Sequence, residues 1–151
     1  MMADTQMDTQ TAISFEVHAE IRIDAPAEVV WRSLVEDIGM WWPHSFRDGR
    51  VSLEAWIGGR FLEEWDGGGA LYGVVTHLVD GERLTTSGHM GMPGAREYVK
   101  TFELEAAGDQ TIVRTTASTL GDISDERREN YRRGGLELLD ALKAHVEKRS
   151  A

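Results

Sequence analysis

Apolar and polar side chains alternate strictly along residues 15–24. Val17, Ala19, Ile21 and Ile23 share one face of this segment, and charged or polar residues occupy the other. A period of two over this length predicts a half-buried β-strand. Residues 1–14 are polar and show no such pattern, so we expect a disordered N-terminal tail there. Residues 15–149 are then expected to form a single domain, which is the usual arrangement for a chain of this length.

After the first strand the apolar residues follow a helical spacing. Pro26 interrupts the strand and suits the first position of a helix. Apolar residues from Ala27 to Leu34 then recur at intervals of three or four, which predicts a helix that ends near residues 37–39. A short helical turn ended by Pro43 is expected next.

Six further strands are predicted between residues 51 and 119. Turn signals rich in Gly, or of the Asp-Gly type, separate them. These turns are too short for a parallel crossover, which needs about a dozen residues, so we expect antiparallel pairing. The predicted strands cover residues 51–55, 59–66, 70–79, 82–90, 95–106 and 110–119.

The last predicted element is a long helix. Ser124 is a suitable N-cap, and Asp125 and Glu126 favour the positive end of the helix dipole. Two adjacent glycines, Gly134 and Gly135, cost about 1 kcal/mol each relative to Ala inside a helix. They indicate either close approach to the sheet, a bend that leaves space for a ligand, or a break between two shorter helices. The stripe expected to face the sheet consists of Tyr131, Gly135, Leu138, Leu142 and Val146.

This order of elements predicts an α+β domain in which one curved antiparallel sheet is covered by the final helix. The chain has 16 Lys and Arg against 26 Asp and Glu, a net charge of −10, which opposes binding to nucleic acid or to anionic membranes. The absence of cysteine excludes disulfides and thiolate chemistry. No apolar run approaches the roughly 18 residues of a membrane span. The first residues lack the features of a secretion signal, so we expect a cytoplasmic protein.

Several short motifs, taken in order, carry a resemblance to a known superfamily. They are Ala25-Pro26 with Val30-Trp31, Trp41-Trp42, Gly58-Gly59-Arg60-Phe61, Gly73-Val74 through Arg83-Leu84, and Thr101-Phe102-Glu103-Leu104 followed by Gly108 and Thr111. The chain resembles the SRPBCC (START-like, helix-grip) superfamily, and within it the AHSA-type family, named after an activator of the heat-shock protein ninety ATPase. The superfamily has polyketide cyclase and dehydratase relatives. The resemblance implies a seven-stranded antiparallel sheet around the C-terminal helix, with a cavity between them. Leu136 stands where the family carries a Trp, so packing over the cavity is expected to differ.

The alternation along the strands predicts which side chains line such a cavity. A deep apolar space with a few polar groups is typical of small-ligand sites, although the same aromatic residues could simply fill a core. The expected ligand-binding residues are Trp41, Trp42, Phe46, Trp56, Phe61, Glu63, Trp65, His77, His89, Met90, Tyr98, Lys100, Phe102, Leu138 and Leu142.

Glu63 and Lys100 are charged residues on faces that otherwise point inward. One interpretation gives them, together with His89, a catalytic acid or base role or a polar contact with a ligand. The other places them at strand ends that are exposed to solvent. His44 is a further candidate acid or base, or else an ordinary surface histidine. The His spacings suit no metal site, and no cofactor is expected.

Three functions are compatible with these observations. The first is binding of a small hydrophobic molecule, such as a lipid or an aromatic or polyketide-like compound. The second is an enzyme of the cyclase, dehydratase or hydrolase kind, with Glu63, Lys100, Tyr98, His77 and His89 as candidate groups. The third is an interaction module that binds a chaperone. A homodimer formed through an exposed sheet edge is also plausible on these grounds.

Overall fold

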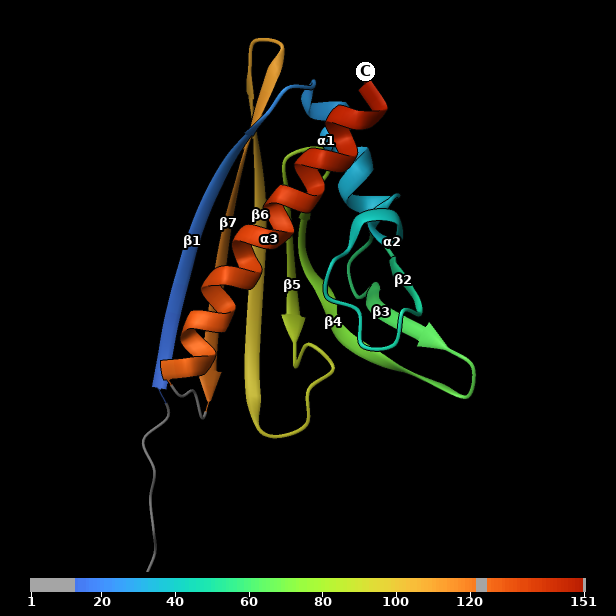
Figure 1. The fold of residues 1–151 in the computed structure, drawn as a ribbon, viewed down its shortest axis with the longest axis vertical. Helices are drawn as coiled ribbons and strands as arrows, with labels where there is room; N and C mark the ends of the chain where they lie inside the picture. The colour runs from blue at the N-terminus through green and yellow to red at the C-terminus, as the bar shows by residue number, and fades with distance from the viewer. Residues whose placement is uncertain (1–12, 122–124, 151) are drawn as a thin grey trace, which may run out of the picture.

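The computed structural model describes residues 13–121 and 125–150. The elements follow the predicted order (Figure 1) and are β1 (Ile13–Ile23), α1 (Ala27–Val35), α2 (Ile38–Trp41), β2 (Arg50–Leu53), β3 (Arg60–Trp65), β4 (Gly68–Val79), β5 (Arg83–Gly88), β6 (Arg96–Ala107), β7 (Gln110–Gly121) and α3 (Asp125–Ser150). The boundary of the expected tail needs a correction, because β1 begins at Ile13 and pairs with β7 from that residue onward. The rest of the tail and the proposed N-cap Ser124 lie outside the described residues.

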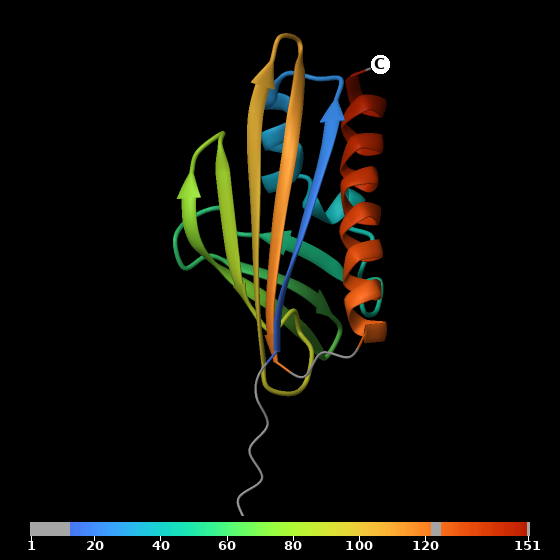
Figure 2. The same cartoon turned by 90° about the vertical axis from the view of Figure 1, so that its left-hand side faces the viewer.

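All seven strands form one antiparallel sheet in the order β1-β7-β6-β5-β4-β3-β2. Consecutive strands from β2 to β7 are neighbours, and β1 adds to the free edge of β7. Figure 2 shows α3 along one side of the sheet, parallel to the long strands, while β2 and β3 cross below at a steep angle. The predicted α+β helix-grip architecture is thus confirmed.

Two β-bulges change the faces that side chains occupy. The register shifts between Phe61 and Leu62 in the β3–β4 pair, and between Val75 and His77 in the β4–β5 pair. An extra residue in a strand moves the following side chains to the opposite face, because the side-chain period is two. Val75 is buried, whereas His77 is exposed.

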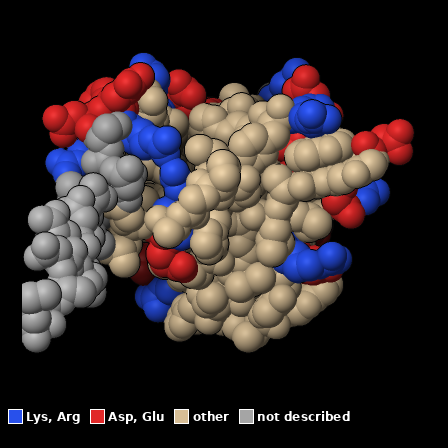
Figure 3. Space-filling model, turned by 90° about the horizontal axis from the view of Figure 1, so that it is seen from below, with Lys and Arg blue, Asp and Glu red and all other residues tan. Residues whose placement is uncertain are grey.

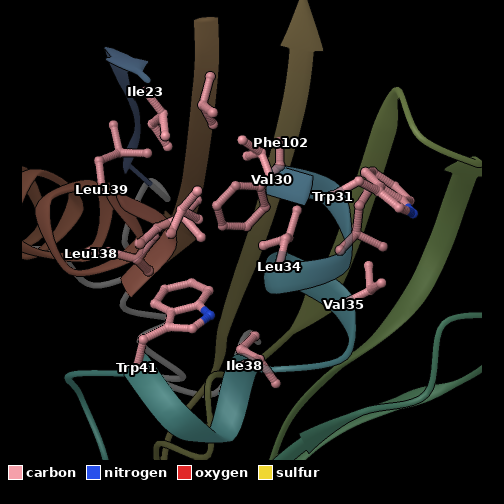
Figure 4. Packing of buried hydrophobic residues seen from close by; sticks show 14 of the residues in the cluster. Ile23, Val30, Trp31, Leu34, Val35, Ile38, Trp41, Phe102, Leu138 and Leu139 are labelled. Carbon is pink, nitrogen blue, oxygen red and sulfur yellow. The ribbon is translucent and has the colours of Figure 1, made fainter. Parts of the chain in front are cut away.

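The main core lies beneath the C-terminal half of α3. Figure 4 shows Leu138 and Leu139 of this helix facing α1, α2 and the end of β1. Leu142 and Val146 have no exposed surface, which confirms this part of the predicted stripe. Trp41 of α2 is fixed in the core by its indole N–H, which donates to the Ser33 carbonyl at 2.8 Å. Within the described chain, no helix is both long and apolar enough to span a membrane.

Candidate functional site

A cavity of about 600 Å³ lies under the N-terminal half of α3 and opens to solvent. We call it the aromatic cavity. The sheet contributes Tyr72, Arg96, Tyr98 and Lys100; the loops contribute Trp42, His44, Phe46, Met90 and Met92; and α3 contributes Glu126, Arg127, Asn130, Tyr131, Gly134, Gly135 and Leu138.

The end of the molecule that carries the first turn of α3 and the loop between β5 and β6 is mostly uncharged at its centre. Figure 3 shows this end from below, with Lys, Arg, Asp and Glu gathered mainly toward the rim. A surface of this kind suits the mouth of a site for an apolar molecule.

Two glycines of α3 line the cavity and place no side chain in it at their own positions. Both Gly134 and Gly135 lie within one continuous helix, so the predicted alternative of two shorter helices is wrong. A Cβ added at Gly135 would meet no atom within 4 Å, and one at Gly134 would meet only the His44 ring, at 3.6 Å. The glycines therefore leave space instead of permitting close contact with the sheet. His44 Nε2 lies 3.0 Å from the Gly134 carbonyl, and since a carbonyl only accepts, Nε2 carries the hydrogen.

Lys100 is the most unusual group in the aromatic cavity. Its side chain comes from β6, whose alternation places Tyr98, Lys100 and Phe102 on the inner face, and only 5% of it is exposed. No ion pair or hydrogen bond joins its ammonium group to any other described residue, and its recorded contact is with the Phe102 ring at 5.4 Å. Burial lowers the pKa of Lys100 from 10.5 to about 8.

Two tyrosines and an arginine line the aromatic cavity together with Lys100. The rings of Tyr98 and Tyr131 stack at 5.7 Å between centroids. Arg96 donates from Nη1 to the Tyr131 hydroxyl at 3.0 Å, while its Nε is buried without a partner among the described residues. Burial raises the pKa of Tyr98, and the neighbouring Tyr131 adds to the effect. The Tyr98 phenol therefore stays protonated at neutral pH.

Glu63 supports the cavity wall from behind and does not line it. Its carboxylate accepts hydrogen bonds from three backbone N–H groups, those of Phe46 at 2.6 Å, Arg47 at 2.9 Å and Gly49 at 2.9 Å. The Tyr72 hydroxyl donates a fourth at 2.7 Å. A Cβ at Gly49 would lie 2.5 Å from the Glu64 carbonyl oxygen, so glycine is needed for this approach. Glu63 thereby fixes the loop that carries Phe46.

The ionisation of Glu63 follows from these contacts. Its side chain has no exposed surface, although it lies just beneath the exposed residues of the loop. Burial by itself would raise the pKa, but the hydrogen bonds from Tyr72 and the three backbone groups outweigh it and lower the pKa from 4.5 to about 2. Burial and the Glu63 carboxylate in turn raise the pKa of Tyr72. These contacts give Glu63 a structural role in holding the loop, and its lowered pKa makes it a weak base, so they do not support the acid or base role predicted for it.

The structure brings six of the predicted site residues together around the aromatic cavity. They are Trp42, Phe46, Met90, Tyr98, Lys100 and Leu138. Glu63 and Lys100 are both buried, so the interpretation that these positions are exposed strand ends is also corrected.

The other predicted site residues lie outside the cavity lining. Trp41, Phe61, Phe102 and Leu142 belong to the core. Trp65 packs against the Arg47 guanidinium at 5.4 Å, outside the lining. Trp56 is 59% exposed in the turn before β3, and the candidate acid–base residues His77 and His89 are exposed as well.

Ten of the sixteen lining residues were not predicted as ligand contacts, and Tyr72, Arg96 and Tyr131 are three of them. Arg96 has the same strand parity as Tyr98 and Lys100, and Tyr131 belongs to the predicted inward stripe of the last helix, so the pattern contained a signal for both. Tyr72 is the extra residue of the first bulge in β4, since Phe61 pairs with Gly73 and Leu62 with Leu71, and strict alternation does not hold there.

A second hollow of about 690 Å³ lies between α1, β2 and the turn after β4. Trp31 lines it and donates from its indole N–H to Asp80 at 3.1 Å. Its other charged lining residues are exposed. Among the described residues that line this second hollow, none is a buried charged group comparable with Lys100. No group of three or more His, Asp or Glu among the described residues is arranged to hold a metal ion.

The fold and the position of the cavity define a helix-grip domain, a curved antiparallel sheet closed by its C-terminal helix. The model of the family described as activator of Hsp90 ATPase homolog 1-like protein matches residues 24–147. The chain therefore belongs to this family, as the sequence resemblance predicted. Leu136, at the family's Trp position, is 57% exposed and does not cover the cavity.

Solved structures show the same fold. The Mll3558 protein from Rhizobium loti is 17% identical, with a TM-score of 0.71 over 89% of this chain and 99% of its own. The CV1439 protein from Chromobacterium violaceum is 21% identical, with a TM-score of 0.66 over 87% of this chain and 96% of its own. DynU16, from the dynemicin biosynthetic locus, is 18% identical, with a TM-score of 0.65 over 87% of this chain and 47% of its own. Among curated proteins, none matches the chain significantly.

Proposed function

We propose that the protein binds a small, largely apolar molecule in the aromatic cavity. One observation carries the proposal: a space of about 600 Å³ between α3 and the sheet is lined by aromatic and Met side chains around buried Lys100, which has no charge partner among the described residues. Pockets of roughly 300–1,000 Å³ with this lining are typical of sites for lipids, aromatic compounds and similar ligands. A small-molecule partner also agrees with the place of DynU16 in a biosynthetic locus.

The proposal is tested with N-phenyl-1-naphthylamine, a neutral apolar dye whose fluorescence rises when it leaves water. We expect saturable binding and a melting temperature that increases with dye concentration, because a ligand of the native state stabilises it. In the variant Gly135→Trp, the indole has room to enter the cavity, and dye binding should be lost. Leu136→Trp adds the same bulk at an exposed neighbouring position and serves as the control.

The result against the proposal would be the absence of saturable dye binding by the folded wild-type protein. Equal binding by Gly135→Trp and Leu136→Trp, with circular dichroism showing both folded, would place the dye elsewhere and would also reject the aromatic cavity as the site.

An enzyme that uses the same cavity is the second candidate function. Lys100 and Tyr98 are adjacent on the inner face of β6, one with a pKa lowered toward neutrality and the other kept protonated. Such a pair could serve as base and acid on a bound carbonyl compound. Conversion of a bound aromatic or polyketide-like compound by the wild type, and its loss in both Lys100→Met and Tyr98→Phe, would favour this function. The chaperone-binding alternative is supported by the family description alone.

A further inference from the structure

The aromatic cavity contains two cationic groups, Lys100 and Arg96, on the inner face of β6. Lys100 has no acidic partner among the described residues, and Arg96 has no carboxylate within ion-pair distance in that same part of the chain. One carboxylate, Glu126, is found among the described lining residues, and it is exposed at the start of α3. The chain as a whole carries a net charge of −10, so this local excess of positive charge runs against the overall composition.

A buried ammonium group without a partner is costly, and proteins normally pair such charges. The ring face of Phe102 at 5.4 Å offsets part of this cost. The nearby phenol of Tyr98 stays protonated and supplies no negative charge. Because Lys100 has no acidic partner among the described residues, a negative charge on a bound ligand would compensate it best.

We infer that the ligand of the aromatic cavity is an apolar molecule that carries one anionic group, and that this group contacts the Lys100 ammonium. The inference rests on the proposed function and specifies its ligand class: an aromatic or alicyclic acid, with a carboxylate or sulfonate at one end. The apolar body of the ligand lies among Trp42, Phe46, Tyr72 and Tyr131.

Arg96 has a secondary role in this arrangement. It lies four residues before Lys100 on the same face of β6, which separates their Cα atoms by about 13 Å. Its Nη1 already donates a hydrogen bond to the Tyr131 hydroxyl at 3.0 Å. The Arg96 guanidinium instead contributes positive potential to the cavity, while Lys100 makes the direct contact.

A neutral carbonyl or hydroxyl compound fits the site less well. Such a group can accept a hydrogen bond from Lys100, but it leaves the buried positive charge uncompensated. An anion accepts the same hydrogen bond and also forms an ion pair with the ammonium group, which compensates the buried charge.

Two dyes of the same ring skeleton separate the alternatives. 1-Anilinonaphthalene-8-sulfonate carries the anionic group, and N-phenyl-1-naphthylamine lacks it. At pH 7 we expect the wild-type protein to bind the sulfonate at least about tenfold more tightly, given the strength of hydrogen bonds to charged groups. Lys100→Met, which retains length and loses charge, should weaken sulfonate binding by about tenfold to a hundredfold and weaken binding of the neutral dye by far less.

Lys148→Met is the matched control, because it removes the same charge from an exposed position near the end of α3. It should leave the affinity for both dyes unchanged. Arg96→Met should weaken sulfonate binding by less than Lys100→Met does.

The outcomes distinguish this inference from the proposed function. If the wild type binds the neutral dye as tightly as the sulfonate, the inference is overturned and the proposed function stands. An equal loss of both dyes in a folded Lys100→Met protein also overturns it. If the wild type binds neither dye, the proposed function itself fails. The comparison of the two dyes on the wild type needs no variant, so it decides the question even if a variant does not fold.

Discussion

Replacement of Glu63 by Gln removes the charge around which the loop of residues 42–49 is arranged. The Glu63 carboxylate accepts four hydrogen bonds, from the backbone of Phe46, Arg47 and Gly49 and from the Tyr72 hydroxyl. A glutamine offers one acceptor oxygen, and its NH₂ group faces the N–H and O–H groups that donate to the carboxylate in the wild type. The change should therefore destabilise the protein and loosen the wall that carries Phe46.

The magnitude follows from the ionisation of the carboxylate. A pKa lowered from 4.5 to about 2 means that the native state prefers the charged form by about 3 kcal/mol, at about 1.4 kcal/mol for each tenfold change. We expect Glu63→Gln to lose about 3 kcal/mol of unfolding free energy at pH 7, which for a chain of this length lowers the melting temperature by roughly 10 °C. Urea denaturation followed by tryptophan fluorescence measures the loss.

The pH dependence supplies the sharper test. The native pKa of Glu63 lies below the unfolded one, so its contribution is complete above pH 4.5 and is lost as the pH falls toward 2. The deficit of Glu63→Gln relative to the wild type should therefore shrink by more than half between pH 7 and pH 3. Glu54 is the control: its pKa is also lowered to about 2, chiefly by hydrogen bonds from Arg60, but the pair is exposed to solvent. Glu54→Gln should thus cost far less.

A loss of less than about 1 kcal/mol of unfolding free energy at pH 7 would refute the reasoning, because the loss of one ordinary hydrogen bond would explain it. A deficit that stays constant down to pH 3 would show that the neutral carboxyl serves as well as the carboxylate.

Three further changes have expected outcomes. Lys100→Met should stabilise the protein at pH 7 by about 3 kcal/mol, because the native pKa of about 8 lies below the unfolded 10.5. Wild-type stability should accordingly rise with pH from about 8 toward 10, and urea denaturation across that window should show the advantage of the variant disappearing. Leu142→Ala should cost about 2–5 kcal/mol, whereas Leu136→Ala at an exposed site should change stability by less than about 0.5 kcal/mol. Gly135→Ala should raise the melting temperature, because it improves helix propensity by up to about 1 kcal/mol and the new Cβ meets no atom within 4 Å; a lower melting temperature would show that the cavity does not tolerate the methyl group.

Local periodicity was sufficient to predict the element order and the inner faces of the long strands β1, β6 and β7. The parity of Tyr98, Lys100 and Phe102 in β6 is an example, and all three are buried as predicted. Those strands pair over their full length without a bulge, so the period of two holds throughout. The family resemblance, which extends along most of the chain, also predicted how the C-terminal helix covers the sheet.

The parts of the site that could not be predicted depend on contacts between segments far apart in sequence. The partners of Glu63 belong to residues 46–49, a loop with no periodic pattern, and no rule of spacing links them. The outward position of His77 results from a bulge in β4 that leaves no sequence signature. Leu142 lies on the predicted inward stripe of α3, but the position of α1 and α2 under that half of the helix makes it part of the core.

The two halves of α3 differ in what lies beneath them. From Leu138 onward the helix rests on solid core, whereas the turns before it, with Gly134 and Gly135, cover hollow space. Opening free energies vary along a protein with the apolar contacts that each segment makes, so amide hydrogens of the first turns should exchange with deuterium faster than those of residues 138–146. The first turns of α3 can thus open while residues 138–146 stay packed on the core, which would let a ligand enter and leave the cavity without global unfolding.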